Sequence, residues 1–336
     1  MKRIALNGLG RIGRLTVRRL GSILPDFLCA VNDPASLDQV VQLLRYDSVH
    51  GPSGLTIAGE TDGARDYLLL GERRVPLFHE VDPSLIPFPA ATRLVVEASG
   101  RFTRRDAAAR HLKGGVTHVV ISAPSPDADL TVIAPVNGNE LDPARHRVIS
   151  NASCTAHATA PMLRILEDAF GLEAAGMSTV HVVTNDQRLL DGPHPDRRRG
   201  RAAFQSIIPT TSSAFGALHG AMPELPAGFD GVALRVPTLN VNLVDLVATL
   251  RQDADKASLR AAFETAAAGP WQGIVALAEP HTVSCDIRGR TESVVMDLAL
   301  TQTLGTRFVK LLGWHDNEVA YAARLCELVV DLAGRI

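Results

Sequence analysis

The stretch that decides the fold of this chain is Arg3-Ile4-Ala5-Leu6-Asn7-Gly8-Leu9-Gly10-Arg11-Ile12-Gly13. A short β-prone run leads into a Gly-x-Gly-x-x-Gly motif, and a helical stretch follows to about residue 20. A second apolar run, residues 27–32, ends at Asp33, which lies 20 residues beyond Gly13. This order of strand, glycine-rich turn, helix, strand and acid is typical of a dinucleotide-binding βαβ unit.

The three glycines and the acid have separate expected roles. Gly8 permits a tight turn, Gly10 lets backbone N–H groups approach a pyrophosphate, and Gly13 allows the helix to pack closely. The helix N-terminus then faces the anion with its partial positive charge. Asp33 is placed to accept hydrogen bonds from the adenosine ribose and would repel a 2′-phosphate, which favours NAD over NADP. An ordinary glycine-containing turn is the alternative, and the surrounding pattern favours the nucleotide site.

Composition limits the class of protein. The 336 residues suit two domains at ~150 residues each. With 34 Lys and Arg against 36 Asp and Glu, the net charge of -2 does not indicate a polyanion-binding protein. The four cysteines are too scattered for a zinc site or a disulfide framework. Because we find neither a signal-peptide pattern nor an apolar run near ~18 residues, we expect a cytoplasmic protein without a membrane segment.

Apolar runs continue along the chain, and those before about residue 150 differ in length from those after it. Runs at 93–98, 116–122 and 131–136 extend the βα pattern and predict a mainly parallel sheet. After about residue 150 the strand-like runs are longer, at 179–183, 231–236, 243–250 and 293–300. Helical patterns occupy 154–170, 256–267 and 318–333. The sequence therefore predicts an α/β protein whose second half is α+β.

Cys154 is a candidate nucleophile. Ser153 is the expected N-cap of the helix that follows, so Cys154 falls in its first turn, where the helix end lowers the pKa of a thiol. A buried structural thiol is an equally good interpretation of this segment alone. His181 ends a strand-like run 27 residues later. A histidine there is usually a satisfied polar residue, but pairing with Cys154 would make it a base.

The remaining cysteines, histidines and arginines give weaker indications of a functional site. We expect Cys29, Cys285 and Cys326 to pack in the core. We interpret His111, His118 and His146 as surface residues, since they lack a metal-ligand pattern. The basic run at 196–201 lacks interleaved aromatics and is weak support for nucleic-acid binding. It suits small phosphates or subunit contacts better.

Seven segments together resemble the phosphorylating glyceraldehyde-3-phosphate dehydrogenases of the bacterial and eukaryotic type. The resemblance runs in order from about residue 3 to residue 333 without a large gap. The segments are 7–14 (NGLGRIGR, where the family has NGFGRIGR), 46–51 (YDSVHG), 97–103 (EASGRFT), 121–124 (ISAP), 150–155 (SNASCT), 235–240 (RVPTLN) and 316–318 (DNE).

The resemblance implies NAD-dependent oxidation of glyceraldehyde 3-phosphate to 1,3-bisphosphoglycerate, a step of glycolysis. Cys154 would attack the aldehyde as a thiolate, and the thiohemiacetal would pass hydride to NAD. His181 would act as the base and as a hydrogen-bond donor to the developing oxyanion. Inorganic phosphate would then attack the thioester, which stays reactive after oxidation.

The resemblance also implies the binding residues and a homotetramer. Asn317 would hold the nicotinamide carboxamide, and Tyr321 would help to fix the ring face. The arginine run would fall in the family's S-loop, near the cofactor and a neighbouring subunit. The expected cofactor contacts are Gly8, Gly10, Arg11, Ile12, Gly13, Asp33, Ser122, Asn317 and Tyr321. The expected substrate-phosphate residues are Thr184 and Arg235, and those for inorganic phosphate are Ser153, Thr155, Arg199, Ser212 and Ser213.

The chain departs from the family pattern near the expected active site. The usual Cys-Thr-Thr-Asn-Cys becomes Cys-Thr-Ala-His-Ala at 154–158, and the usual Tyr-Asp-Asn-Glu-Trp-Gly-Tyr becomes His-Asp-Asn-Glu-Val-Ala-Tyr at 315–321. Ser212 and Ser213 replace a threonine and a glycine. We interpret the chain as a specialised paralogue. Dehydrogenation of erythrose 4-phosphate or another phosphorylated aldehyde is the nearest alternative.

A catalytically weak RNA- or protein-binding paralogue is the alternative from another class. The joint presence of Cys154, His181, Arg235 and Asn317 argues against it. We predict a Rossmann NAD-binding domain at residues 1–153 and a catalytic domain with a mixed sheet at 154–317. The last helix, within 318–336, has a one-sided apolar stripe and should return to the first domain.

Overall fold

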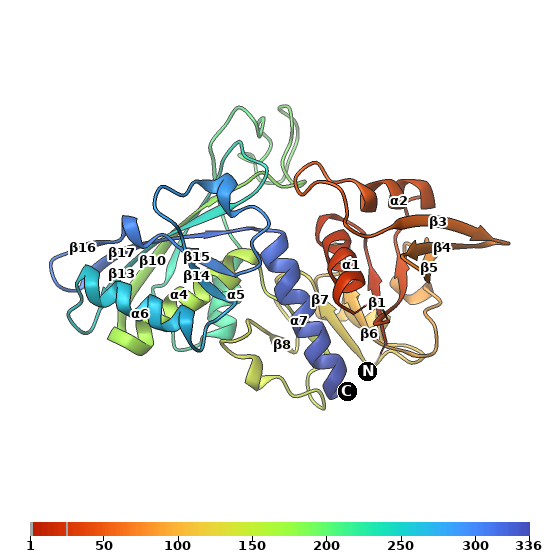
Figure 1. The fold of residues 1–336 in the computed structure, drawn as a ribbon, viewed down its shortest axis with the longest axis horizontal. Helices are drawn as coiled ribbons and strands as arrows, with labels where there is room; N and C mark the ends of the chain where they lie inside the picture. Colours follow the sequence, from red (N-terminus) through yellow and green to blue (C-terminus); the bar gives the residue numbers. More distant parts are fainter. Residues whose placement is uncertain (1–2, 25) are drawn as a thin grey trace. The chain divides into compact units, whose positions relative to one another are not determined.

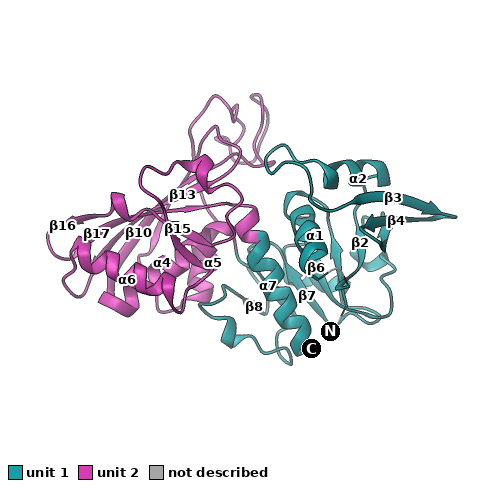
Figure 2. Ribbon diagram, in the orientation of Figure 1, with its two compact units in different colours: residues 1–152, 322–336 teal, residues 153–321 magenta. Residues whose placement is uncertain are grey.

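The computed structural model describes residues 3–24 and 26–336. The chain divides into two compact units, one formed by residues 1–152 with 322–336 and the other by residues 153–321 (Figure 2). Each unit contains one β-sheet.

Unit 1 has the expected parallel sheet. Its parallel strands stand in the order β2-β1-β6-β7-β9-β8, and Figure 1 labels β1, β6, β7 and β8 among them. Because β2 lies on one side of β1 and β6 on the other, the order reverses at β1, and ligands of such sheets bind at this switch point. The Rossmann fold is therefore confirmed. The strands are β1 (Arg3–Asn7), β2 (Leu28–Asn32), β6 (Thr92–Glu97), β7 (His118–Ile121), β8 (Leu130–Thr131) and β9 (Val148–Ser150).

An antiparallel extension of this sheet is absent from the sequence analysis. It comprises β3 (Ile57–Asp62), β4 (Arg65–Leu70) and β5 (Arg73–Phe78), and β5 pairs in parallel with β2. Gly63 and Gly71 make the two hairpin turns with φ of 61° and 62°, a conformation that favours glycine. The predicted strand at 131–136 is wrong beyond Thr131, where the chain leaves the sheet.

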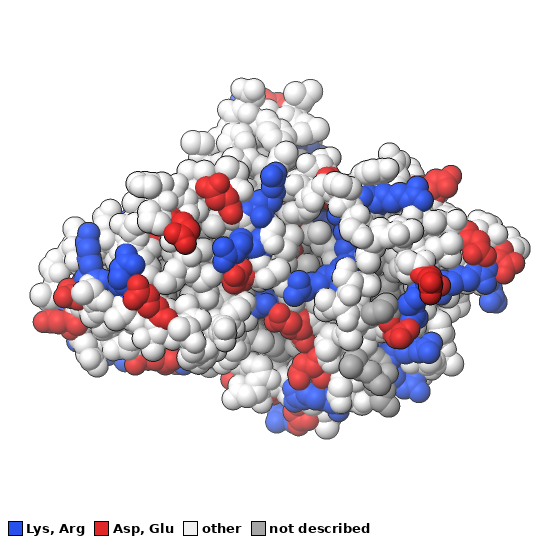
Figure 3. All heavy atoms as spheres, viewed as in Figure 1, with Lys and Arg blue, Asp and Glu red and all other residues white. Residues whose placement is uncertain are grey.

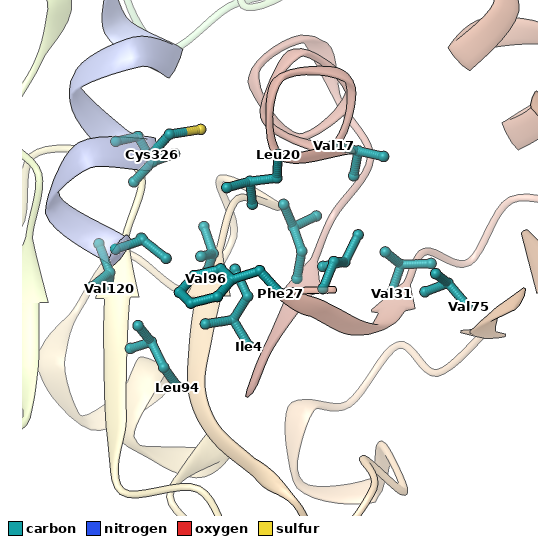
Figure 4. Packing of buried hydrophobic residues seen from close by; sticks show 14 of the residues in the cluster. Ile4, Val17, Leu20, Phe27, Val31, Val75, Leu94, Val96, Val120 and Cys326 are labelled. Carbon is teal, nitrogen blue, oxygen red and sulfur yellow. The ribbon is translucent and has the colours of Figure 1, made fainter. Parts of the chain in front are cut away.

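The core of unit 1 joins the sheet to helices at both ends of the chain. Ile4, Val31 and Val96 from the strands pack with Leu20 of α1 and Cys326 of α7 (Figure 4). The apolar stripe of α7 thus packs within the first unit. The helices described in unit 1 are α1 (Arg11–Ile23), α2 (Leu37–Arg45) and α3 (Arg105–Ala108), with the larger part of α7 (Val319–Arg335). Its short 3-10 turns are η1 (Pro83–Leu85), η2 (Ala109–His111) and η3 (Gly138–Glu140).

Unit 2 is built on a mixed sheet, as predicted. Its strand order is β11-β12-β10-β13-β17-β15-β14, and β16 pairs with β17. β10 runs parallel to β12 and antiparallel to β13. The strands are β10 (Leu172–His181), β11 (Ile208–Thr210), β12 (Asp230–Arg235), β13 (Asn242–Leu250), β14 (Val275–Leu277), β15 (Val294–Met296), β16 (Gln302–Leu304) and β17 (Phe308–His315).

Helix α4 (Cys154–Phe170) is the central helix of unit 2 and matches the predicted range. It contacts α5 (Ala214–Ala221), α6 (Lys256–Ala268) and strands of the sheet (Figure 1). The predicted strand at 293–300 is correct only for β15, because η5 (Leu298–Leu300) follows it. A further 3-10 turn, η4 (Ser284–Ile287), precedes β15.

Several predictions about single side chains need correction. His111 and His118 are buried rather than on the surface, while His146 is partly exposed. Cys29 and Cys326 are buried as predicted, but Cys285 is exposed. His111, at the end of η2, lies 2.8 Å from the carboxylate of Glu97 at the end of β6, and the spacing of histidines in the sequence does not reveal such a partner.

Surface charge, helix hydrophobicity and the grouping of metal-ligating side chains were each compared with what particular kinds of site require. On the face shown in Figure 3, basic and acidic side chains are interspersed. Within residues 3–24 and 26–336, no helix is long and apolar enough to cross a membrane. The same residues contain no group of three or more His, Cys, Asp or Glu side chains that could hold a metal ion.

Candidate active site

The start of α4 presents Cys154. Ser153 is the N-cap, as predicted, and its hydroxyl accepts a hydrogen bond of 3.1 Å from the Ala156 N–H. Cys154 is the first helical residue, and its Sγ lies 4.0 Å from the Thr155 hydroxyl. Burial raises the pKa of the Cys154 thiol, although the Thr155 hydroxyl and the charge of Arg235 act to lower it. The expected lowering by the helix end is therefore outweighed by desolvation.

The chain returns from α4 directly into the strand that carries His181. Gly171 ends α4 with a φ of 69°, and β10 begins at Leu172. The helix and the strand that follows run in opposite senses, so the last residue of β10 comes back to the start of α4. His181 Nε2 lies 3.9 Å from Cys154 Sγ. The structure thus brings together the two residues that the sequence analysis singled out as nucleophile and base.

His181 is buried, and its other ring nitrogen has two close neighbours. Nδ1 lies 2.8 Å from the Val182 carbonyl oxygen and 2.6 Å from Nη1 of Arg235. Burial, with the positive charge of Arg235 as the second cause, lowers the pKa of His181 to about 3. With the pKa of Cys154 raised, this geometry describes a neutral thiol facing a neutral imidazole.

Sheet register places Arg235 beside His181. β10 and β12 are parallel, and His181 and Arg235 are paired residues at the ends of these strands. Within the described residues Arg235 forms no ion pair with a carboxylate, and its Nε is buried without a hydrogen-bond partner. Burial and the charge of Arg199 lower the pKa of Arg235. A cation held in this way is expected to attract an anion.

Arg199 is held in the loop between β10 and β11. Its guanidinium donates to Asp186 at 2.6 Å and to the Thr210 hydroxyl at 2.9 Å. Thr184 opens the same loop, and its N–H donates to Gln187 Oε1 at 3.2 Å. A surface depression of about 570 Å³ is lined here by Asp186, Arg188, His194, Pro195, Asp196, Arg199 and Thr211.

The glycine motif in unit 1 has the geometry that a pyrophosphate site requires. Gly8 has a φ of 95°, and a Cβ on it would collide with the Ser99 backbone. A Cβ on Gly13 would collide with the Gly8 carbonyl oxygen. A Cβ on Gly10 would meet nothing within 4 Å, so the backbone is open to a ligand at this glycine. Gly10 is also the N-cap of α1, where unpaired N–H groups favour an anion.

The other predicted cofactor residues of unit 1 surround this motif. Asp33 follows β2 and accepts hydrogen bonds from the N–H groups of Leu9 at 2.7 Å and Ala35 at 2.9 Å. Arg11 forms an ion pair of 2.5 Å with Asp47. Ser122 follows β7, and its buried hydroxyl has no hydrogen-bond partner in the described structure. An open backbone approach and an unused hydroxyl fit a dinucleotide at these strand ends.

Comparison with known proteins agrees with this geometry. The glyceraldehyde 3-phosphate dehydrogenase NAD-binding domain profile matches residues 2–105, and the C-terminal domain profile matches residues 153–317. Glyceraldehyde-3-phosphate dehydrogenase of Geobacillus stearothermophilus is 41% identical over 335 residues, covering 99% of this chain and 98% of the relative. Glyceraldehyde-3-phosphate dehydrogenase 2 of Streptomyces avermitilis is 39% identical over 336 residues, covering 99% of each chain.

The chain belongs to the glyceraldehyde-3-phosphate dehydrogenase family. Its cofactor is accordingly NAD, the ligand of the matched N-terminal domain. The resemblance drawn from the sequence motifs is confirmed over the full length.

A buried polar network that the sequence analysis missed supports the NAD-binding edge of the dehydrogenase. Glu97 Oε2 accepts from Asn7 Nδ2 at 2.6 Å and lies 2.8 Å from His111 Nε2. Asn32 Nδ2 in turn donates to Asn7 Oδ1 at 2.7 Å. The network ties together the carboxyl ends of β1, β2 and β6. The sequence does contain a sign of this network, because each of the three apolar runs ends in a polar residue: Asn7, Asn32 or Glu97.

Asn317 and Tyr321, the dehydrogenase residues expected at the nicotinamide, have different surroundings. Asn317 Oδ1 accepts from the Val241 N–H at 3.1 Å and from Asn240 Nδ2 at 3.2 Å. These bonds fix the amide plane, and within the described residues no hydrogen bond uses its Nδ2. Tyr321 packs edge-on against the ring of His157, with centroids 5.9 Å apart.

Two of the departures from the dehydrogenase pattern are histidines in the interior of unit 2. His157 and His315 are both buried. Burial, with a smaller effect from His157, lowers the pKa of His315 to about 3. His315 is paired across the sheet with Asn242, whose Oδ1 accepts from the Val182 N–H at 2.9 Å. Asn242, which the sequence analysis did not single out, therefore holds the backbone of Val182, the residue whose carbonyl oxygen contacts His181.

The two substituted serines lie at the start of α5. Ser212 Oγ accepts from the Ala214 N–H at 3.2 Å, and Ser213 is the residue before the helix. Within the described residues, no hydrogen bond joins either serine to Cys154, His181 or Arg235. Direct contact therefore links Cys154 to His181 and His181 to Arg235. Arg199 is close enough for its charge to act on both His181 and Arg235.

Proposed function

We propose that this enzyme catalyses the NAD-dependent, phosphorylating oxidation of glyceraldehyde 3-phosphate to 1,3-bisphosphoglycerate, a reaction of glycolysis. The observation that carries the proposal is one cluster: Cys154 Sγ lies 3.9 Å from His181 Nε2, and Arg235 lies against the same imidazole without a carboxylate partner. The cluster offers a nucleophile, a base and a cation for a phosphorylated substrate. The names of the full-length relatives agree with this reaction.

Cys154 and His181 divide the covalent chemistry between them. The Cys154 thiol gives its proton to His181 Nε2, and the sulfur forms a bond to the aldehyde carbon. The protonated Nε2 then donates a hydrogen bond to the oxygen that becomes negatively charged. When bound, NAD supplies the hydride acceptor. The cysteine thioester that remains is open to attack by inorganic phosphate, which releases the acyl phosphate and restores the thiol.

Two anion sites complete the proposed active site. Arg235 and Thr184 would bind the phosphate of the substrate, and the support is the buried guanidinium of Arg235 with its unused Nε donor. The attacking phosphate would be bound by Ser153, Thr155, Arg199, Ser212 and Ser213. A charged donor is required at both sites because each phosphate carries close to two negative charges.

We propose the following residue contacts for the cofactor. Gly8, Gly10, Arg11, Ile12 and Gly13 would hold the pyrophosphate, either through backbone N–H groups or by shaping the turn. Asp33 would accept from the adenosine ribose. Ser122, Asn317 and Tyr321 would contact the nicotinamide half. We assign NAD binding to the sheet of unit 1 and catalysis to unit 2.

Neither alternative function has comparable support. The matched curated relatives named above act on glyceraldehyde 3-phosphate by name, rather than on erythrose 4-phosphate. An RNA site would draw on the four arginines of residues 196–201, and two of them are already paired with carboxylates. Arg199 is paired with Asp186 at 2.6 Å, and Arg201 is paired with Asp191 at 3.0 Å.

We also propose that the enzyme is a homotetramer of the cytoplasm. Large apolar side chains are exposed in and near the loop that joins β10 to β11, which suits a protein interface. They are Leu189, Leu190, Phe204, Ile207 and Leu239. Light scattering should give a mass near four chains, and a monomer at micromolar concentration would contradict the proposal.

The reaction is tested by following NADH formation with two aldehydes and three acceptor conditions. Glyceraldehyde 3-phosphate and erythrose 4-phosphate are each supplied with phosphate, with arsenate or with no acceptor. Fast turnover of the three-carbon substrate only with phosphate or arsenate supports the proposal. Preference for the four-carbon substrate would replace it, and no turnover under any condition would favour the binding-protein alternative.

A further inference from the structure

His79 connects two parts of unit 1. It follows β5, and its ring lies against the turn that leads from β2 into α2. Its Nδ1 lies 2.8 Å from the Ala35 carbonyl oxygen and 3.1 Å from the Asp33 carbonyl oxygen. On the other side of the ring, Nε2 lies 3.1 Å from Oδ2 of Asp66 on β4. The imidazole thus links the antiparallel extension to the turn that carries Asp33.

All three of these contacts are with hydrogen-bond acceptors. A carbonyl oxygen and an ionised carboxylate oxygen can only accept, so each contact requires a proton on the ring nitrogen. Both nitrogens carry a proton only in the imidazolium form of histidine. Asp66 is held in place for its contact, since its Oδ1 accepts from the Thr61 hydroxyl at 2.7 Å. The geometry therefore describes a positively charged His79 that donates from both sides of the ring.

The turn that His79 holds also orients the Asp33 carboxylate. Oδ1 of Asp33 accepts from the Ala35 N–H at 2.9 Å, and Oδ2 accepts from the Leu9 N–H at 2.7 Å. His79 contacts carbonyl oxygens at both ends of this same turn. The orientation of the carboxylate therefore depends on a turn that the imidazolium holds.

A neutral imidazole cannot keep all of these bonds. It has a single N–H, and the charged acceptor Asp66 makes the stronger hydrogen bond, so the proton stays on Nε2. The lone pair of Nδ1 then faces the carbonyl oxygens of Asp33 and Ala35 and repels them. The start of the turn stays anchored, because the Asp33 N–H donates to the Phe78 carbonyl oxygen at 3.0 Å. Loss of the proton thus releases the turn without opening the sheet.

We propose that His79 is a positioning residue for the adenosine ribose of NAD: its imidazolium form orders the turn of Asp33, and its neutral form releases this turn. The inference rests on the proposed function in one respect, that Asp33 accepts from the ribose. Histidine ordinarily changes its charge between pH 5 and pH 8. The bound ribose favours the ordered turn, and the ordered turn favours the proton. Cofactor affinity therefore falls as the pH rises, and binding takes up protons from the solvent.

Other titratable and charged groups surround His79. A cavity of about 670 Å³ brings solvent to the ring, whose side chain is 36% exposed. Arg65, Asp66, Tyr67 and Glu80 line this cavity with His79, and Asp33 lies on the other side of the ring. Among these residue types, histidine is the one that ordinarily changes charge between pH 5 and pH 8. A binding response in this range that depends on His79 and Asp66 would therefore report on the ring.

The test measures the binding of ADP-ribose to the full chain by titration calorimetry at pH 6 and pH 8.5. ADP-ribose carries the adenosine ribose and the pyrophosphate but no nicotinamide, so its binding requires no turnover. We expect its affinity to be about fivefold higher at pH 6, the effect of one hydrogen bond. At pH 7, titrations in two buffers of different ionisation enthalpy should show proton uptake on binding. Equal affinities at the two pH values, or a release of protons, would overturn the inference.

Asp66→Asn separates the charge of the ring from its bulk. The asparagine amide can donate to Nε2, so a neutral ring can keep its proton on Nδ1 and still hold the turn. The amide oxygen can still accept from the Thr61 hydroxyl. We expect this variant to bind ADP-ribose at pH 8.5 as tightly as the parent does at pH 6. Affinity at pH 8.5 that is equal to or lower than that of the parent would contradict the proposal.

His79→Ala and Asp62→Asn complete the comparison. His79→Ala should bind ADP-ribose at both pH values as weakly as the parent does at pH 8.5, without proton uptake. Asp62→Asn removes a carboxylate from the same hairpin, where it pairs with Arg74 at 2.7 Å, and it should keep the pH response of the parent. Proton uptake that persists in His79→Ala, or a response that is lost in Asp62→Asn, would reject the assignment to His79.

Hydrogen exchange separates failure of this inference from failure of the ribose assignment. In the parent at pH 8.5, the N–H groups of residues 33–36 should exchange faster than in Asp66→Asn at the same pH. This difference without a pH response of the ADP-ribose affinity would reject the ribose contact of Asp33. Equal exchange in the two proteins would reject the role of His79. Absent NADH formation with an intact binding response would reject the proposed reaction alone.

Discussion

His111 Nε2 lies 2.8 Å from Glu97 Oε2, and both side chains are buried in unit 1. Removing one partner from such a pair leaves a buried polar or charged group uncompensated, which costs about 3–5 kcal/mol. We therefore expect His111→Leu to lower the free energy of unfolding by roughly that amount in urea titrations. The double variant His111→Leu/Glu97→Gln should recover part of the loss. Equal stability of wild type and His111→Leu would show that the pair does not support the sheet.

Cys154→Ser tests the assignment of the nucleophile. An alcohol is a far poorer nucleophile than a thiolate, so NADH formation should fall at least about a thousandfold. NAD affinity, measured by titration calorimetry, should stay within about twofold of wild type because the glycine motif is untouched. Exposed Cys285→Ser is the matched control and should retain wild-type turnover. Comparable turnover of the Cys154 variant would remove the basis of the proposed mechanism.

Gly10 and Gly13 make a matched pair for the cofactor loop. Gly13→Ala places a methyl group against the Gly8 carbonyl oxygen and should destabilise the fold by about 1–3 kcal/mol. Gly10→Ala has open space around it, so the protein should unfold at the wild-type temperature. Its methyl group should weaken NAD binding by about tenfold, since the backbone loses its close approach to the pyrophosphate. Unchanged NAD affinity in Gly10→Ala would place the pyrophosphate elsewhere.

Asp33→Asn examines the discrimination between NAD and NADP. The N–H groups of Leu9 and Ala35 bond to different Asp33 oxygens, so the single amide oxygen of asparagine keeps one of these bonds while the negative charge is lost. We expect the ratio of kcat/KM for NAD over NADP to fall by about tenfold, since repulsion of the 2′-phosphate is lost. Asp38→Asn, on the neighbouring helix α2, serves as the charge control. A ratio unaffected by Asp33→Asn would assign the choice to other residues.

His315 should make the fold sensitive to acid. Its pKa is about 3 in the folded chain and near the ordinary 6.5 when unfolded, so the unfolded state binds more protons between these values. Stability is therefore lost as the pH falls below about 6.5. Relative to wild type, His315→Tyr should reduce the loss of unfolding free energy between pH 6 and pH 5 by about 1 kcal/mol. A loss in His315→Tyr equal to that of wild type would contradict this prediction.

The elements that local patterns define were predictable. The βαβ unit around Gly8 and the range of α4 follow from spacing and from the N-cap Ser153, which depend on neighbours in the sequence. The antiparallel extension β3-β4-β5 was missed because its strands carry many exposed polar residues and no clear alternation. The burial of His111 was missed for another reason: His111 lies in the turn η2, and its partner Glu97 comes from strand β6.

In the candidate site, too, features set by neighbours in the sequence were predictable, whereas contacts between distant residues were not. Cys154 was visible as the first residue of a helix, but the 27 residues that separate it from His181 say nothing about their distance in space. The contact between Arg235 and His181 depends on the pairing of β10 with β12, a relation across 54 positions. The motifs of the family indicated these residues together before any geometry was known. Nothing in the sequence indicates that Nδ1 of His181 has both the Val182 carbonyl and the Arg235 guanidinium as neighbours.

The parallel pairing of β10 with β12 sets His181 beside Arg235 independently of the length of the chain that connects the two strands. Residues 182–229 connect the end of β10 to the start of β12, and the pairing of these two strands holds His181 opposite Arg235. Insertions or deletions in this excursion would alter the exposed loop and its apolar tip without separating the two side chains. Relatives could therefore change the partners or the substrate fit of this loop by length variation alone, while natural selection preserves the alignment of the reacting groups.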